Sequence, residues 1–312
     1  MIILGERYTF STVEKERLKK QFKQIIHLNY KDKPASECIK KLSKLLDQQS
    51  VSLIVLNTQA VLPEKLLNYL TRLELCGVHY MSIERFLEKY LHKCLINEEH
   101  PNLYLAQEIH PYSPWQYVQK RLIDYISILL LLIPTLLAIL YTQYRILKES
   151  PGPLFFRQKR VGKGEKEFCC IKLRSMHLDA EKDGAQFACD DDPRTFPWGK
   201  TIRYTKIDEL IQLWNVAKGE MHFVGPRPER KIWTKEFEKA IPHYRQRHLV
   251  APGITGLAQI KYQYGSGKLD AQQKLMYDLY YIKHWSLFLE LKIIWKTILF
   301  VLTKKRNNLS NF

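Results

Sequence analysis

Adjacent carboxylates at Asp208 and Glu209 are the residues of this sequence best suited to chemistry on a charged substrate. Thr205 is of the N-cap type and apolar residues recur at helical spacing from 206 to 216, so both carboxylates are expected in a first helical turn. The helix dipole favours the ionised form there. The same Thr-x-x-Asp spacing also matches a capping box, so a purely structural role stays open.

A second candidate site residue is Arg227, which stands between Pro226 and Pro228 in the run Val-Gly-Pro-Arg-Pro-Glu. The two prolines restrict the backbone on either side of the arginine and hold it extended. A guanidinium group binds phosphate in a bidentate way, and a rigid mount reduces the entropy that is lost on binding. The run therefore predicts a phosphate clamp, with an ordinary turn and a solvated arginine as the alternative.

The elements that position these residues begin with a charge-free segment from Tyr125 to Tyr144. Twenty helical residues extend about 30 Å, which is enough to span a bilayer. Pro134 lies at the midpoint and costs a straight helix about 3 kcal/mol. Basic residues flank both ends, and the positive-inside rule places both flanks on one membrane face; they are Lys120, Arg121, Arg145, Lys148, Arg157, Lys159, Arg160 and Lys163. We favour a re-entrant helix broken at Pro134 over a single span, and both over a buried soluble helix.

Short blocks from about residue 118 to 303 follow one another in a characteristic order. They are Lys120-Arg121 with Asp124, Ser150-Pro151-Gly152-Pro153 with the segment 155–162, Lys172-Leu173-Arg174-Ser175-Met176, Ile202-Arg203, Asp208-Glu209-Leu210, the segments 212–216 and 218–221, the Pro-Arg-Pro run, and the segments 252–259 and 277–286. This region resembles the bacterial sugar transferase family. Its members are monotopic polyprenyl-phosphate phosphoglycosyl transferases, which begin exopolysaccharide, O-antigen and glycoconjugate assembly.

The resemblance implies an enzyme that moves a sugar 1-phosphate from a UDP-sugar to polyprenyl (undecaprenyl) phosphate and releases UMP. It implies that Asp208 is the nucleophile of a covalent phosphosugar intermediate and that Glu209 binds Mg²⁺, with a further acid–base role. The substrate phosphates would be held by Arg203 and Arg227, and less directly by Lys172 and Arg174. The location implied is the cytoplasmic face of the bacterial inner membrane.

Two departures from the family pattern stand out. Ile133 precedes Pro134 where the family usually has serine, so a serine hydroxyl cannot bond the freed backbone, and Thr135 is the candidate to replace it. Lys206 and Ile211 stand where the family often has serine and proline around the carboxylates. We assign no chemistry to these two positions.

The charge distribution agrees with a membrane-surface protein. Residues 1–115 hold 16 Lys and Arg against 13 Asp and Glu, whereas residues 116–312 hold 33 against 19, so most of the net charge of +17 belongs to the second region. Cations attract an anionic leaflet, a nucleotide-sugar and a lipid phosphate. The segment from Trp285 to Thr303 is expected as an interfacial helix, or as a helix that packs on the core. Nucleic-acid binding is the rival interpretation of the charge, but no recognition motif supports it.

Residues 1–115 resemble the degenerate Rossmann-like, CoA-binding-like α/β domain of larger family members, and the resemblance places them ahead of a mainly α (α+β) membrane transferase domain at 116–312. Strands near Ile2–Leu4, Ile25–Leu28, Val51–Leu56 and Val78–Met81 alternate with helices near Val13–Phe22, Ser36–Asp47 and Pro63–Cys76, which predicts a small parallel sheet. The region has no glycine-rich phosphate loop. We interpret it as a regulatory or dimerising module, which would make the chain a homodimer, with a purely structural role as the alternative.

Two non-enzyme hypotheses remain beside the transferase. One is a membrane-anchored nucleotide-sugar sensor with an inactive site, which the intact Asp208-Glu209 pair argues against. The other is a nucleic-acid binder, which the lipid-compatible segment argues against. The sugar that is transferred does not follow from these motifs, because sugar specificity depends on the shape of the pocket.

Overall fold

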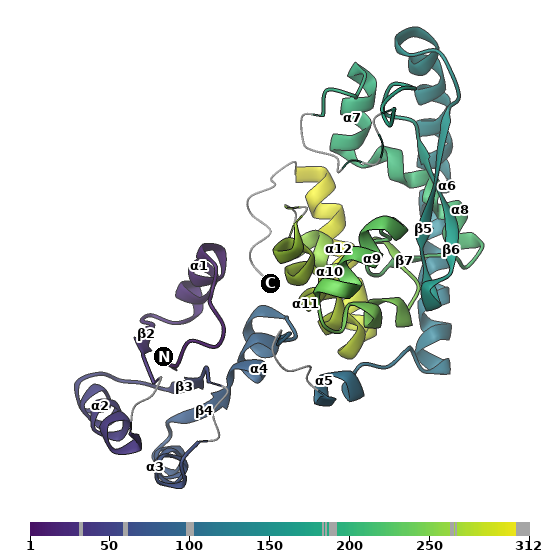
Figure 1. Cartoon of the computed structure of the whole chain (residues 1–312). Coiled ribbons are helices and arrows are strands. Elements are labelled where there is room, and N and C mark those ends of the chain that lie inside the picture. Colours follow the sequence, from purple (N-terminus) through teal and green to yellow (C-terminus); the bar gives the residue numbers. More distant parts are fainter. Residues whose placement is uncertain are drawn as a thin grey trace. The chain divides into compact units, whose positions relative to one another are not determined.

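A computed structural model describes residues 1–30, 34–58, 62–97, 103–182, 184, 186, 192–262, 265 and 267–303. The chain divides into two compact units, one from Met1 to Leu95 and one from Ile96 onward (Figure 1). The first unit is an α/β structure and the second is mainly helical. The predicted order of an α/β region followed by a mainly helical region is therefore confirmed.

The N-terminal unit contains a four-stranded parallel sheet in the order β2-β1-β3-β4. Its elements are β1 Ile2–Leu4, α1 Thr12–Gln21, β2 Ile26–Leu28, α2 Ala35–Gln48, β3 Leu53–Leu56, α3 Glu64–Leu75, β4 His79–Ser82, α4 Ile83–Phe86 and the π-helical turn η1 Leu87–Leu91. All four predicted strands and all three predicted helices are present within about two residues of the expected bounds. The alternation of apolar strands and amphipathic helices was sufficient to predict this sheet.

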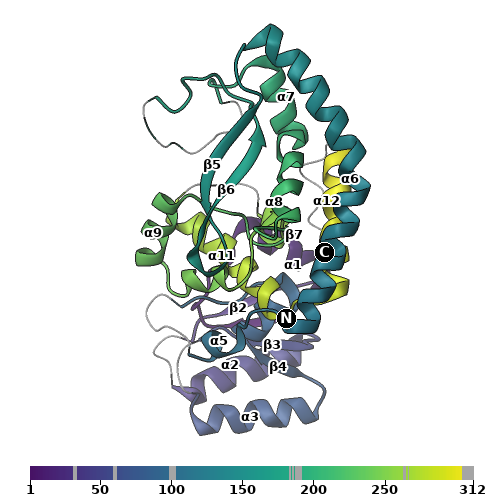
Figure 2. The ribbon, with the colours of Figure 1, turned by 90° about the vertical axis from the view of Figure 1, so that its right-hand side faces the viewer.

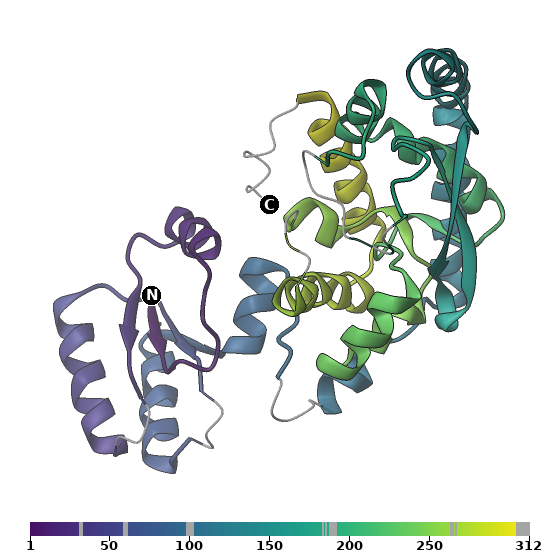
Figure 3. The ribbon, with the colours of Figure 1, turned by 45° about the horizontal axis from the view of Figure 1, so that its top comes forward.

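One face of this sheet is covered by α2 and α3, which lie side by side (Figure 3). Ile2 and Leu4 of β1 align with Ile54 and Leu56 of β3, so these four side chains point to the same face. They form one buried cluster with residues of the two helices, including Leu42. The sheet is therefore held by an ordinary apolar core.

The second unit is built along one long helix, α6, which runs from Pro114 to Glu149. Ser113 and Gln116 form a capping box at its start, and Pro114 occupies the first turn, where its missing N–H costs nothing. In the described chain α6 is the one helix that is long and apolar enough to cross a bilayer, and only 22% of its most apolar stretch is buried. An apolar helix exposed to this extent does not serve as the core of a soluble domain.

Helix α6 remains helical through Pro134, so the break expected at this proline does not interrupt the helical backbone. Its ribbon changes direction along its length (Figure 2). Proline removes one hydrogen bond and bends a helix without necessarily ending it. The Thr135 hydroxyl donates to the Leu131 carbonyl at 2.7 Å, within the turn that the proline disturbs. The carbonyl that Pro134 leaves without an N–H donor is that of Leu130, so the Thr135 hydroxyl bonds the neighbouring carbonyl and does not take the role expected for it.

The second unit contains further, shorter elements besides α6. They are α5 Leu103–Glu108, the antiparallel hairpin of β5 Phe155–Val161 and β6 Glu167–Leu173, the 3₁₀ turn η2 Lys163–Glu165, α7 Pro197–Thr205, the 3₁₀ helix η3 Ile207–Gln212, α8 Leu213–Ala217, the parallel pair β7 His222–Val224 and β8 Gly253–Thr255, α9 Lys231–Ala240, the 3₁₀ helix η4 Tyr244–Leu249, α10 Leu257–Lys261, α11 Lys268–Lys283 and α12 Leu287–Thr303. Helix α6 contacts α7, η3, α8 and β7.

Helix α12 confirms the helix expected between Trp285 and Thr303, and its faces differ. Leu289, Glu290 and Ile293 are buried, whereas Phe288 and Trp295 are exposed. Glu290 pairs with Lys120, and both side chains are fully buried. Lys120 therefore lies in the flank of the apolar segment, as expected, but its ammonium group is enclosed by the protein.

Candidate active site

Asp208 and Glu209 lie in the first turn of η3, directly after α7. The expected continuous helix over 206–216 is wrong: Thr205 ends α7, Lys206 adopts the left-handed conformation with φ 61°, and the carboxylates lie on a 3₁₀ helix. The Thr205 hydroxyl donates to the Thr201 carbonyl and does not cap the second helix. This break turns both carboxylates inward, and they are 5% and 6% exposed.

The two carboxylates differ in protonation behaviour. Burial and the neighbouring charge of Glu209 raise the pKa of Asp208 to about 6. Burial acts on Glu209 in the same sense, but the charges of Arg227 and Lys172 outweigh it and hold the pKa of Glu209 well below its usual range. Asp208 Oδ1 is buried and has no hydrogen-bond partner among the described residues. With this pKa Asp208 is mostly ionised at neutral pH, and its Oδ1 is bonded to none of the described residues.

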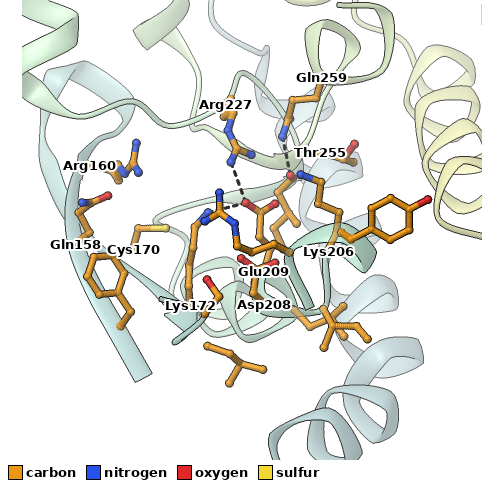
Figure 4. Close-up of a pocket in the computed structure, with 18 of the residues that line it drawn as sticks. Gln158, Arg160, Cys170, Lys172, Lys206, Asp208, Glu209, Arg227, Thr255 and Gln259 are labelled. Carbon is orange, nitrogen blue, oxygen red and sulfur yellow. Dashed lines mark hydrogen bonds and ion pairs between the residues drawn. The ribbon is translucent and has the colours of Figure 1, made fainter. Parts of the chain in front are cut away.

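Two of the predicted phosphate-binding residues contact Glu209 directly (Figure 4). Lys172 Nζ, on β6, lies 2.5 Å from Glu209 Oε1. Arg227 Nη2, on the loop after β7, lies 2.9 Å from the same oxygen, and its side chain is 40% exposed. An anion that enters the site could exchange for Glu209 as the partner of either cation.

The backbone position of Arg227 depends on a close approach between the backbone segments at Gly225 and Gly253. Gly225 donates to the Thr255 carbonyl at 2.8 Å, and Gly253 donates to the Pro226 carbonyl at 2.9 Å. A side chain at Gly225 or Gly253 would collide with the facing backbone. The glycines therefore let the β7–β8 pair close tightly, and the Pro-Arg-Pro segment leaves this pair in a fixed direction.

The remaining two predicted phosphate ligands are placed differently. Arg203, in the last turn of α7, lines the same cavity, and its charge acts to lower the pKa of Asp208 against the dominant effect of burial. Arg174 is 5% exposed and donates to the Ser150 hydroxyl at 2.8 Å and to the Pro153 carbonyl at 2.7 Å. Arg174 thus ties the end of α6 to the hairpin.

Residues without an assigned chemical role in the sequence also belong to the site. Lys206 reaches over the cavity, and its charge acts on both carboxylates. Its position beside the acidic pair was visible in the sequence. Arg247 forms a buried ion pair with Asp278, and its guanidinium also donates to the Arg227 carbonyl. No sequence signal joined these two residues, since 31 positions separate them.

The site opens into a cavity of about 1620 Å³ that combines charged and apolar walls. Its polar walls include the carboxylates and the cations Lys172, Lys206 and Arg227. Leu131 of α6 and Ile298 of α12 belong to its apolar walls. A cavity with this lining suits a ligand that carries both phosphate groups and an apolar chain.

The described residues contain no group of three or more His, Cys, Asp or Glu side chains that could hold a metal ion alone. Mg²⁺ is commonly bound by one or two carboxylates together with substrate phosphates and water. The adjacent carboxylates, with the unpaired Asp208 Oδ1, fit this type of site.

The family model for bacterial sugar transferases matches residues 115–304. The chain is 40% identical over 238 residues to the UDP-N-acetylgalactosamine-undecaprenyl-phosphate N-acetylgalactosaminephosphotransferase of Aeromonas hydrophila, covering 75% of this chain and 55% of the relative. It is 44% identical over 159 residues to the UDP-glucose:undecaprenyl-phosphate glucose-1-phosphate transferase of Xanthomonas campestris pv. campestris, covering 50% and 33%.

The exopolysaccharide production protein PSS of Rhizobium leguminosarum bv. phaseoli is matched over almost its whole length. It is 36% identical over 193 residues, covering 60% of this chain and 96% of the relative. By contrast, the chain spans about half the length of the Aeromonas relative and a third of the Xanthomonas relative. The family match over more than half of the chain, together with the buried acidic pair and its two cations, shows that this chain belongs to the bacterial sugar transferase family.

Proposed function

We propose that this chain transfers a sugar 1-phosphate from a UDP-sugar to undecaprenyl phosphate, releases UMP and so begins the synthesis of a surface polysaccharide or glycoconjugate. The names of the Aeromonas and Xanthomonas relatives describe this type of transfer, and the name of the Rhizobium relative refers to exopolysaccharide production. The observation that carries the proposal is the unpaired, buried oxygen of Asp208 in a cavity lined by cations. A reactive carboxylate among phosphate-binding side chains suits covalent phosphosugar transfer.

The proposed reaction has two steps, and both are substitutions at the phosphorus atom that bears the sugar. An Asp208 oxygen attacks the phosphorus that bears the sugar, and the bond from that phosphorus to the bridging oxygen breaks, so that UMP leaves with the electron pair. The product is an acyl phosphate that joins the sugar phosphate to Asp208. An oxygen of undecaprenyl phosphate then attacks this phosphorus, and Asp208 leaves as a carboxylate. Each step replaces one oxygen substituent on phosphorus by another.

The surrounding side chains lower the charge repulsion in both steps. Arg227 and Lys172 would turn from Glu209 to the phosphate oxygens, and Arg203 would contribute from α7. Glu209, together with the donor diphosphate, would hold Mg²⁺, which when bound would neutralise phosphate charge near the attacking carboxylate. The further role of Glu209 in acid–base chemistry belongs to the same proposal.

Helix α6 would place this site at the cytoplasmic face of the bacterial inner membrane. We propose that it enters the leaflet, bends at Pro134 and returns to the same side, because basic residues such as Arg121 and Lys148 flank both of its ends. The exposed residues Phe288 and Trp295 of α12 suit the interface beside it. The soluble donor and the lipid acceptor then meet at the level of the headgroups.

The N-terminal unit is assigned a regulatory or dimerising role. The Aeromonas alignment covers 238 residues of this chain, which is more than lie from residue 115 to the end, so it includes part of the sequence before the family match. The similarity to that relative thus extends into the region before residue 115, which supports a role connected with the transferase. Dimerisation through this unit would be seen in the mass of the purified protein, measured by light scattering.

The test is UMP release by the detergent-purified protein with undecaprenyl phosphate and a panel of UDP-sugars that includes N-acetylgalactosamine and glucose, the sugars named in the relatives. We expect turnover with at least one donor. Asp208→Asn should lower turnover by at least about 10³-fold, because the amide cannot attack phosphorus. Its melting temperature should not fall, because the amide keeps the side-chain shape. Substantial turnover by this variant would reject the covalent assignment, and no turnover by the unaltered protein would favour a sensor.

A further inference from the structure

Two buried ion pairs flank the segment that carries Arg227. Lys120 Nζ of α6 lies 2.5 Å from Glu290 Oε1 of α12, and both side chains are 0% exposed. Arg247 Nη2 of η4 lies 2.9 Å from Asp278 Oδ2 of α11, with exposures of 6% and 3%. The four residues belong to four different elements that meet around one short loop.

Each of these cations also holds a backbone carbonyl of that loop. Lys120 Nζ donates to the Val224 carbonyl at 2.6 Å, and Arg247 Nη2 donates to the Arg227 carbonyl at 2.9 Å. Pro226 and Pro228 have no N–H to donate, so the loop is anchored largely through its carbonyl groups. The two cations hold it on both sides of its first proline.

Both carboxylate oxygens of Glu290 are hydrogen-bonded. Glu290 Oε2 accepts from the Tyr281 hydroxyl at 2.8 Å and from Trp285 Nε1 at 3.0 Å, and Lys120 Nζ also donates to the Tyr281 hydroxyl at 2.8 Å. A buried ion pair of this kind adds little stability over apolar side chains of the same volume. Its distinct contribution is a fixed position for the groups that it bonds.

A second side chain of α6 holds the strand that leads into the loop. Asp124 lies one turn after Lys120 and accepts from the Phe223 amide at 2.7 Å, and it also pairs with His222 Nδ1 at 2.7 Å. Strand β7 is therefore held at 222, 223 and 224 by two side chains of the apolar helix. A shift of α6 would therefore also move β7, the strand that leads to Arg227.

We propose that the Lys120–Glu290 and Arg247–Asp278 pairs are positioning residues, which fix the Arg227 guanidinium where it binds the donor diphosphate. They act through the backbone of residues 224–227 and do not themselves touch the substrate. Because Lys120 belongs to the apolar helix, the pair also links insertion of α6 in the membrane to the geometry of the site. The inference rests on the proposed function, which assigns phosphate binding to Arg227.

The test is a double-mutant cycle between the first pair and Arg227, measured as UMP release. Lys120→Met with Glu290→Gln removes both charges and keeps an acceptor for Tyr281 and Trp285. We expect this variant to lower kcat/KM for the UDP-sugar by about 10- to 100-fold, mainly through KM, and to leave KM for undecaprenyl phosphate within about twofold. In an Arg227→Ala background the same change should cost less than about twofold, since the residue being positioned is gone.

An equal loss in both backgrounds, or no loss in either, would overturn the inference. If the double variant does not fold, Asp278→Asn replaces it, because the amide keeps the shape but weakens the hold on Arg247. The same dependence on Arg227 is then expected. UMP release by the unaltered protein is measured first, so failure of the proposed function is seen separately from failure of the positioning role.

A matched control exists in the N-terminal unit. Lys93 and Glu14 form another buried ion pair, with exposures of 2% and 4%, which also bonds a tyrosine, Tyr8. Lys93→Met with Glu14→Gln should leave kcat/KM for the UDP-sugar within about twofold of the unaltered value. A loss equal to that of the Lys120 and Glu290 variant would show that removal of any buried pair has this effect, and would also overturn the inference.

Discussion

Two of the three arginines predicted from sequence to bind phosphate have different surroundings in the structure. Arg227 is 40% exposed and contacts Glu209 in the cavity, whereas Arg174 is buried against Ser150 and Pro153. A partly exposed guanidinium can turn to a ligand, but one enclosed by backbone acceptors cannot turn without leaving them unpaired. Phosphate binding therefore belongs to Arg227 in our proposal, and Arg174 has a structural role.

This difference predicts opposite effects of two conservative substitutions. Arg227→Lys should raise KM for the UDP-sugar by about tenfold, because an ammonium group cannot bind phosphate in a bidentate way. Arg174→Lys should lower stability by about 1–3 kcal/mol and leave that KM within about twofold, because it loses donors to buried acceptors. Steady-state kinetics and thermal unfolding of both variants provide the measurement. The reverse pattern would contradict both assignments.

His248 predicts a pH dependence of stability. It is 7% exposed, and burial, followed by the charges of Arg247 and Arg245, lowers its pKa to about 3. Below about pH 6.5 the unfolded chain therefore binds a proton that the folded chain does not, and stability falls as the pH drops. This residue alone should account for about 2 kcal/mol lost between pH 7.5 and pH 5.

The measurement is the free energy of unfolding by urea at both pH values, for the unaltered protein and for His248→Asn. Subtraction of the two pH dependences removes the contribution of the other titrating groups. The variant should lack the loss assigned to His248. Equal pH dependences for the two proteins would show that the pKa of this histidine is the same in the folded and unfolded states.

Helix α6 is the element whose behaviour in a bilayer matters most. Its 36 residues would extend about 54 Å if straight, well beyond the hydrocarbon thickness of about 30 Å. Pro134 and the Thr135 hydroxyl allow a bend without loss of the helix. A bent helix of this length can enter and leave through one leaflet surface, which a straight one cannot do.

The re-entrant path is tested with single cysteines at Trp115 and Leu147, which are 69% and 60% exposed and lie near opposite ends of α6. A membrane-impermeant maleimide should reach both only from the cytoplasmic side, because the basic flanks stay inside and the helix turns back. Labelling in right-side-out and inverted vesicles gives the readout. A periplasmic Leu147 position would establish a single span.

The short elements around the acidic pair show where sequence patterns are insufficient. The apolar periodicity of 206–216 fits one helix, but the chain forms η3 and α8 with a left-handed Lys206 before them. A 3₁₀ and an α-helix differ by only 0.6 residues per turn, so a short pattern does not separate them. Burial of Asp208 against the rest of the unit depends on contacts with β6 and α6, which the local pattern does not contain.

At the scale of the whole molecule, the proposed mechanism predicts double displacement. With a UDP-sugar and Mg²⁺ but no lipid acceptor, the enzyme should release about one UMP per active site, and initial-rate plots with both substrates should be parallel. Direct transfer needs both substrates at once and would show neither result. The mass of the intact protein should rise by one sugar phosphate, located on Asp208, and fall again when undecaprenyl phosphate is added.

Controls for this experiment address hydrolysis of the acyl phosphate. Samples quenched at short times separate an intermediate that forms and decays from one that never forms. Asp208→Asn should show neither the burst of UMP nor the increase in mass. An unchanged mass in rapidly quenched unaltered enzyme, under conditions of full turnover, would reject the covalent step.

The sequence by itself determined the parts of this protein that depend on local pattern. The parallel sheet of residues 1–82 followed from alternating apolar runs, and the long apolar helix followed from charge-free composition. The acidic pair and the Pro-Arg-Pro clamp were recognisable because their members are neighbours in the chain. Such features need no knowledge of distant contacts.

Only the tertiary structure decided which charged residues meet. Lys172 and Arg227 converge on Glu209 from positions 37 and 18 residues away, and Lys120 pairs with Glu290 across 170 residues. Because charges are costly to bury alone, the fold stabilises them only where a distant partner arrives. A sequence pattern shows that Lys120 is a charged residue beside the apolar segment, but packing decides that its ammonium group lies inside the protein.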